Sequence, residues 1–157
     1  MSKLALDNGR ASLKEIKVFV KTFGTFEIFL YGEALVFGRS KAKETLAYLI
    51  HKKGSYSTVA EIASVLWEGK DYNRSIQNQT QVIISAMMKT LKDNDINDII
   101  IKERNRISID KTKIKCDYYD FLNKDAGTIK SYDGKYMTNY SWAEITAGEL
   151  LSRKNKT

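Results

Sequence analysis

Polar side chains with no acid among them recur along Ser75 to Lys92, SIQNQTQVIISAMMKTLK. Amide groups can pair with base edges and a lysine can bind a phosphate, so this combination suits a nucleic-acid groove. The candidate contact residues are Asn78, Gln79, Gln81, Ser85, Lys89 and Lys92. A solvated surface helix would have a similar composition, and this alternative stays open.

A short basic hairpin is the second candidate site. Two β-prone runs, Ile99 to Glu103 and Arg106 to Asp110, are separated only by Arg104 and Asn105. A connection of two residues between such runs predicts a β-hairpin. We expect Arg104 and Arg106 to contact a polyanion, although a charged hairpin that only faces solvent is the alternative.

The overall charge agrees with a polyanionic partner. The chain has 157 residues, with 26 Lys and Arg against 19 Asp and Glu, a net charge of +7 and a pI near 9.3. A single cysteine, Cys116, argues against a disulfide framework or a cysteine-based zinc site. The sequence shows no secretory signal and no apolar run long enough to span a bilayer, so we expect a cytoplasmic protein without membrane contact.

Enzymatic chemistry finds little support. The one histidine, His51, stands beside two lysines at a predicted helix end, and the nine glycines form no nucleotide-binding or nucleophile-elbow motif. We therefore expect no enzyme activity, no catalytic residue, no metal and no cofactor.

The candidate helix needs a core to lie on. Five residues recur at helical spacing and predict its buried stripe: Thr80, Ile83, Ile84, Met87 and Leu91. Two helices are predicted before it, from Ser40 to Lys53 and from Thr58 to Gly69, the second with Thr58 and Glu61 at capping-box spacing. Residues 17–37 alternate apolar and polar side chains and predict two or three antiparallel strands, so the expected fold class is α+β.

The last forty residues are rich in aromatic side chains. Residues 117–125 and 141–153 predict helices, with Trp142, Ile145 and Leu150 packing inward, and residues 126–139 predict a loop. Simple packing and a half-formed helical module that binds a partner are both open. We expect a linker over 1–16, a DNA-binding domain over 17–116 and a helical extension over 117–157.

These segments together carry a family resemblance. RSKAKETLAYLI, EIASVLW, IIIKERNRISID, CDYYDF and YDGKYMTNYSWAE are similar to the OmpR/PhoB-type winged-helix output domain of bacterial SARP-like and response-regulator proteins. The resemblance implies a winged helix-turn-helix with an N-terminal β platform, three helices, a hairpin wing and a helical tail.

It also implies a bacterial, two-component type of transcriptional regulator that binds double-stranded DNA. The long helix would enter the major groove, and the wing would lie near the minor groove. A loop with Lys70, Asp71, Tyr72 and Arg74 would face RNA polymerase. Such domains often follow a receiver domain and can bind DNA as homodimers.

One departure from the family pattern affects base recognition. The family usually has arginines around the positions of Ser85, Ala86 and Met88, and arginine is the commonest specific reader of guanine. The chain therefore reads an A·T-rich site, reads DNA weakly, or is a degenerate winged helix that serves as a protein–protein interaction module.

Overall fold

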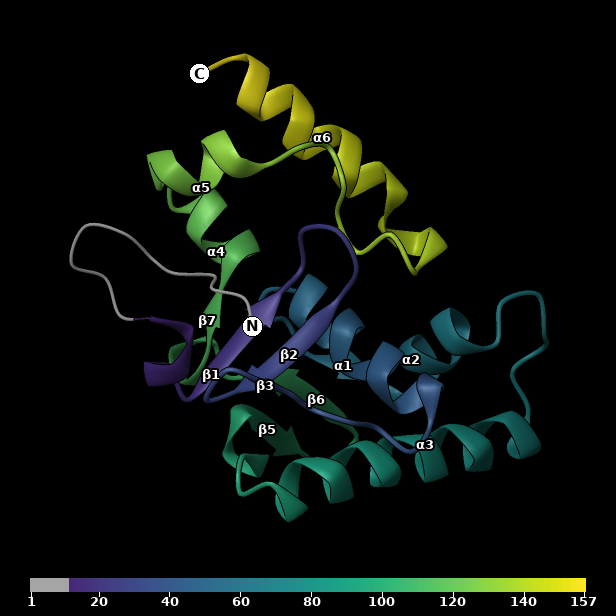
Figure 1. Ribbon diagram of the computed structural model, residues 1–157. Coiled ribbons are helices and arrows are strands. Elements are labelled where there is room, and N and C mark those ends of the chain that lie inside the picture. The colour runs from purple at the N-terminus through teal and green to yellow at the C-terminus, as the bar shows by residue number, and fades with distance from the viewer. Residues whose placement is uncertain (1–11) are drawn as a thin grey trace. The chain divides into compact units, whose positions relative to one another are not determined.

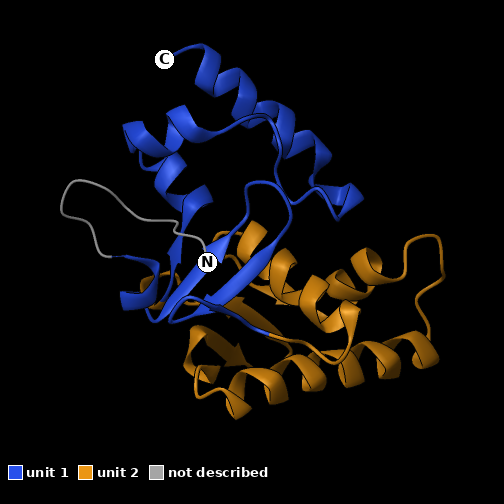
Figure 2. Ribbon diagram, viewed as in Figure 1, with its two compact units in different colours: residues 1–35, 114–157 blue, residues 36–113 orange. Residues whose placement is uncertain are grey.

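The computed structural model describes residues 12–157. The chain divides into two compact units: unit 1 comprises residues 1–35 and 114–157, and unit 2 comprises residues 36–113 (Figure 2). Most of the predicted linker lies outside the described residues, and Leu13–Glu15 at its end form a short 3-10 helix, η1. The domain bounds expected from the sequence stay a prediction.

Unit 2 contains the three predicted helices (Figure 1): α1, Ser40–His51; α2, Val59–Leu66; and α3, Arg74–Asp93. The side chain of Asn73 caps α3 by accepting a hydrogen bond from the Ile76 N–H at 2.9 Å. The predicted stripe of α3 is buried as expected, and Ile76 extends it by one turn. These buried side chains pack α3 against α1 and α2.

The predicted hairpin forms one side of a small sheet in unit 2. Its strands are β5, Ile100–Glu103, and β6, Arg106–Ile109, and β4, Ser57–Thr58, pairs with the other edge of β6. The strand order is β4-β6-β5, and both pairings are antiparallel. The 3-10 helices η2, Asn97–Ile99, and η3, Lys111–Lys113, flank the hairpin.

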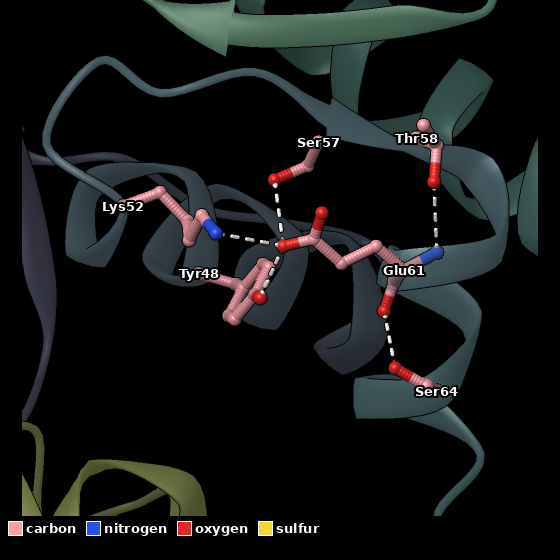
Figure 3. A network of polar contacts seen from close by, with 6 residues as sticks. All are labelled: Tyr48, Lys52, Ser57, Thr58, Glu61 and Ser64. Atoms are coloured by element: carbon pink, nitrogen blue, oxygen red, sulfur yellow. Dashed lines mark hydrogen bonds and ion pairs between the residues drawn. The ribbon is translucent and has the colours of Figure 1, made fainter.

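A polar network joins α1 to α2 (Figure 3). Thr58 caps α2 by accepting from the Glu61 N–H at 3.1 Å, as predicted, but the Glu61 carboxylate is directed elsewhere. It accepts a hydrogen bond from the Tyr48 hydroxyl at 2.6 Å and pairs with Lys52 at 2.9 Å. Burial opposes ionisation, yet these partners hold the pKa of Glu61 below its usual value. The expected capping box is therefore half formed, and Glu61 links two helices instead.

Unit 1 contains a four-stranded sheet. Residues 17–37, where two or three strands were expected, form β1, Val18–Lys21; β2, Glu27–Leu30; and β3, Glu33–Ala34. The fourth strand is β7, Lys115–Cys116, which pairs in parallel with the other edge of β1 and gives the order β3-β2-β1-β7. One strand of this sheet, β7, therefore comes from the segment that follows unit 2 in the sequence, and not from the N-terminal segment.

The segment after β7 is more helical than predicted. It forms α4, Asp117–Leu122; α5, Ala126–Ser131; a 3-10 turn η4, Ser141–Ala143; and α6, Glu144–Asn155. The prediction of a loop over 126–139 was wrong at α5, which Asp125 caps by accepting from the Thr128 N–H at 3.0 Å. Leu150 is buried as expected, but Ile145 is 78% exposed, so its predicted packing was also wrong.

Aromatic side chains make up much of the core of unit 1. Tyr132 and Tyr136 are fully buried, and the ring of Tyr132 lies 4.7 Å from Phe23 and 5.7 Å from Phe121, measured between ring centroids. The Asp117 carboxylate accepts hydrogen bonds from the backbone N–H groups of Thr22 and Phe23. Most of the aromatic content of the tail is therefore explained by packing.

Candidate nucleic-acid interface

Helix α3 presents all six of its predicted contact residues to solvent: Asn78, Gln79, Gln81, Ser85, Lys89 and Lys92 are exposed. The buried stripe on the opposite side of the helix fixes this orientation, because residues three or four apart share a face. The Gln79 amide donates a hydrogen bond to the Ser75 hydroxyl one turn earlier on the same helix, at 3.0 Å. The face carries amides, a hydroxyl and two amines.

One member of this face was not predicted from the sequence. Val82 is 52% exposed, and it lies between Gln81 and Ser85 in the sequence. An exposed β-branched apolar residue among amides is a candidate contact for a thymine methyl group. Ala86 and Met88 are half-buried.

Lys89 has a partner at the end of α3. Its amine forms an ion pair with Asp93 at 2.7 Å, and the two side chains are 75% and 58% exposed. An exposed pair one turn apart contributes only about 0.3–0.5 kcal/mol, so a phosphate can compete for the lysine. Lys89 therefore remains available as a phosphate contact.

The hairpin presents Arg104 at its tip. Arg104 and Asn105 form the turn between β5 and β6, and Asn105 has a φ of 66°, which asparagine tolerates better than most residues. Lys102 and Arg104 are exposed, and within residues 12–157 neither side chain forms a hydrogen bond or an ion pair. Both cations are free to meet a polyanion.

Arg106 is engaged within the protein instead. Its guanidinium pairs with the Glu103 carboxylate at 2.8 Å and lies over the ring of Tyr56, with 4.0 Å between the guanidinium carbon and the ring centroid. The Tyr56 hydroxyl donates to the other carboxylate oxygen of Glu103 at 2.8 Å. The hydrogen bond from Tyr56 is the largest cause of a pKa of Glu103 below its usual value. The three side chains form a closed set, which we call the wing triad.

The loop between α2 and α3 is anchored at its start. The Trp67 indole N–H donates to the Thr80 hydroxyl at 3.1 Å, and the Lys41 amine lies 4.5 Å from the centre of the Trp67 ring. The four residues that the resemblance places toward RNA polymerase, Lys70, Asp71, Tyr72 and Arg74, are all exposed. The loop is therefore held at Trp67, while its exposed residues are accessible to a binding partner.

Positive charge is concentrated in unit 2. Residues 36–113 have 14 Lys and Arg against 9 Asp and Glu, a net charge of +5, out of +7 for the whole chain. Among residues 12–157, no group of three or more His, Cys, Asp or Glu side chains could hold a metal ion. In the same part of the chain, no helix is both long and apolar enough to cross a membrane.

No protein-family model matches the sequence. No curated protein matches it either.

The structure does resemble a solved one. It is similar to Mycobacterium tuberculosis EmbR, whose structure was solved in complex with a low-affinity phosphopeptide; the TM-score is 0.70 at 15% sequence identity. The match covers 88% of this chain and 42% of the EmbR chain, so this chain spans less than half the length of that protein. At this identity the likeness shows the fold alone. Together with the element order described above, it confirms that the chain has an α+β winged-helix fold.

Proposed function

We propose that the chain is a DNA-binding transcriptional regulator of the OmpR/PhoB type, without enzymatic activity. The exposed face of α3 enters the major groove, where Asn78, Gln79, Gln81 and Ser85 meet base edges. Lys89 and Lys92, which are neighbours on one face of the helix, bind phosphates at the edge of the groove. The wing, with Arg104 and Arg106, lies at the neighbouring minor groove.

The observation that carries this proposal is the composition of the exposed side of α3. All six candidates point away from the core, and no acidic side chain interrupts them before Asp93 at the end of the helix. A surface helix that served only solubility would gain from mixed charges, whereas a carboxylate here would repel phosphates. The net charge of unit 2 favours the same partner.

The absence of arginine from this face sets the kind of sequence that is read. Asparagine and glutamine pair best with adenine, and Val82 offers a contact to the methyl group of thymine. None of the six candidate residues is an arginine, whose guanidinium would donate two hydrogen bonds to guanine. We therefore propose that the preferred site is rich in A·T pairs and that phosphate contacts supply much of the affinity.

A second contact follows from the fold and the anchored loop. We propose that Lys70, Asp71, Tyr72 and Arg74 meet RNA polymerase while α3 occupies DNA. Their exposure and the fixed position of Trp67 support this role.

Fluorescence anisotropy on a labelled duplex pool with a randomised centre tests DNA binding. The logarithm of the affinity should fall with the logarithm of the salt concentration, with a slope of about −0.9 for each phosphate contact. Lys92→Gln should reduce the slope by about one contact. Lys130→Gln, on exposed α5 in unit 1, is the matched control and should leave the slope unchanged.

Absence of salt-dependent binding would favour the other candidate, a winged helix that serves as a protein-interaction module. The structure provides less for that function, because Tyr118, Phe121, Tyr132 and Tyr136 in the aromatic tail are buried.

A further inference from the structure

The wing contains a carboxylate where a DNA-binding surface would be expected to avoid one. Glu103 ends β5, directly before Arg104 at the tip of the hairpin. A negative charge beside a phosphate-binding arginine weakens binding unless the carboxylate has another role. The contacts of Glu103 identify that role.

Both oxygens of the Glu103 carboxylate are used inside the protein. One accepts from Arg106, at 2.9 Å from Nε and 2.8 Å from the terminal nitrogen, and the other accepts from the Tyr56 hydroxyl at 2.8 Å. Arg106 also stacks on the Tyr56 ring. Each member of the wing triad therefore touches the other two, and the guanidinium has limited freedom to turn toward a phosphate.

The wing triad links β5 and β6 to the segment just before β4. Glu103 faces Arg106 across the β5–β6 pairing, and Arg106 faces Thr58 across the β4–β6 pairing. Tyr56 lies just before β4, in the segment that leads from α1 into the sheet. The triad thus connects the free end of the hairpin to a strand that continues directly into α2.

This connection matters because the hairpin end has little else to hold it. Lys102, Glu103, Arg104, Asn105 and Arg106 are all exposed, and only the inner parts of the strands reach the core. A two-residue turn supported only by strand pairing frays readily. The triad supplies side-chain contacts at the point where strand pairing is weakest.

We propose that Tyr56, Glu103 and Arg106 are positioning residues that hold the wing so that Arg104, and not Arg106, meets the DNA phosphates. This inference rests on the proposed DNA binding. It assigns phosphate contact to Arg104 and the positioning of the wing to Arg106. The contribution of the carboxylate to the position of Arg104 then exceeds its repulsion of the phosphates.

An Arg106→Lys variant separates the two roles of Arg106. A lysine keeps the charge and still binds a phosphate, but it cannot pair through a planar fork and stack on Tyr56 at the same time. If Arg106 positions the wing, Arg106→Lys and Arg106→Ala lose affinity to a similar extent, about three- to tenfold. If Arg106 binds DNA itself, Arg106→Lys retains nearly the affinity and the salt slope of the unmodified protein, and the proposal is overturned.

A double-mutant cycle tests whether the triad acts through Arg104. Tyr56→Phe removes one uncharged hydroxyl and should weaken binding to the randomised duplex pool when Arg104 is present. In the Arg104→Ala background the same change should have no effect, because there is no longer a side chain to position. A loss of equal size in both backgrounds would mean that Tyr56 contacts DNA directly and would refute the positioning role.

Tyr48→Phe is the matched control for this cycle, since it also removes a hydroxyl that donates to a glutamate, here Glu61 in the network between α1 and α2 (Figure 3). It should leave DNA affinity unchanged. All variants are compared where circular dichroism shows them folded. A direct readout on the free protein is the NMR signal of the Arg106 Nε–H, which should show slow solvent exchange that Tyr56→Phe accelerates.

The unmodified protein is titrated first, so the two proposals fail in different ways. No salt-dependent binding by the unmodified protein overturns the proposed function, and the positioning role with it. Normal binding by the unmodified protein together with normal binding by Arg106→Lys and Tyr56→Phe overturns the positioning role alone.

Discussion

His51 should make the protein less stable in mild acid. It lies in the last turn of α1, and its ring centroid is 6.2 Å from that of Tyr48. Burial, together with the charges of Lys53 and Lys52, lowers the pKa of His51 from 6.5 to about 4. The folded protein therefore holds this imidazole neutral at a pH where the unfolded chain binds a proton.

The sign and the size of the effect follow from proton linkage. Between pH 6.5 and about 4 the unfolded state carries one more proton than the folded state, so the free energy of unfolding falls as the pH falls. The neutral His51 contributes fully to the free energy of unfolding above pH 6.5, and this contribution has been lost once the pH reaches about 4. A full difference of about 2.5 units corresponds to about 3.4 kcal/mol at about 1.36 kcal/mol per unit. Because the ring is partly open to solvent, which screens the nearby charges, we expect about half of this.

Urea unfolding between about pH 7 and about pH 4.5, followed by tryptophan fluorescence, measures this loss directly. His51→Gln is the control, because it keeps a polar side chain of similar size but does not titrate. Carboxylates that also titrate in acid, such as Glu61, are present in both proteins and cancel in the difference. Parallel pH profiles for the two proteins would refute a buried neutral His51.

Three further predictions concern α3. Ile84→Ala should lower the free energy of unfolding by about 2–5 kcal/mol because the side chain is buried, whereas Val82→Ala, at an exposed position, should change it by less than about 0.5 kcal/mol; equal losses in urea unfolding would show that the helix is turned differently. Replacing thymine by deoxyuridine in the best-bound duplex removes only methyl groups and should weaken anisotropy-measured binding by about 0.8 kcal/mol for each lost contact. Val82→Ala should be insensitive to this replacement, and an undiminished sensitivity would exclude Val82 as the contact. Ala86→Arg should tighten binding by about 1.5–3 kcal/mol at best, and more on duplexes that contain G·C pairs; weaker binding by a variant that unfolds normally would show that position 86 does not face the groove.

The sequence predicted best the elements whose signal is local and repeated. The predicted stripe of α3 repeats over about three turns, and its five residues are all buried, with Ile76 added. The hairpin was predictable because only two residues join its strands. The exposure of the six candidates on α3 followed directly from the stripe.

Elements that depend on distant partners could not be predicted in the same way. β7 is only two residues long, and it exists because β1 offers it an edge. Helix α5 is six residues long and contains Gly127, so propensity favoured a loop, although Asp125 three residues before Thr128 was a capping signal.

The wing triad shows the same limit at the candidate site. Arg106 was expected to contact a polyanion, but it pairs with Glu103 and stacks on Tyr56, which lies 47 residues before Glu103 along the chain. Glu61 likewise matched a capping box by spacing, but Tyr48 and Lys52 offered its carboxylate stronger partners. In both cases side chains from another element decided the contact.

The parallel strand β7 has a consequence for the order of folding. Unit 2 is continuous in sequence, whereas unit 1 is made of two segments that unit 2 separates. The bonds that join these segments, such as that from the Thr22 N–H to Asp117, span 95 residues, and the Met137 N–H reaches back to the Thr22 carbonyl. Closing such long loops costs entropy and slows folding. During synthesis the winged-helix core can therefore form first, and β1 must wait with one edge unpaired until residues 115–137 leave the ribosome. A chain interrupted in that interval would expose an open strand edge, the kind of surface that recruits other chains into aggregates.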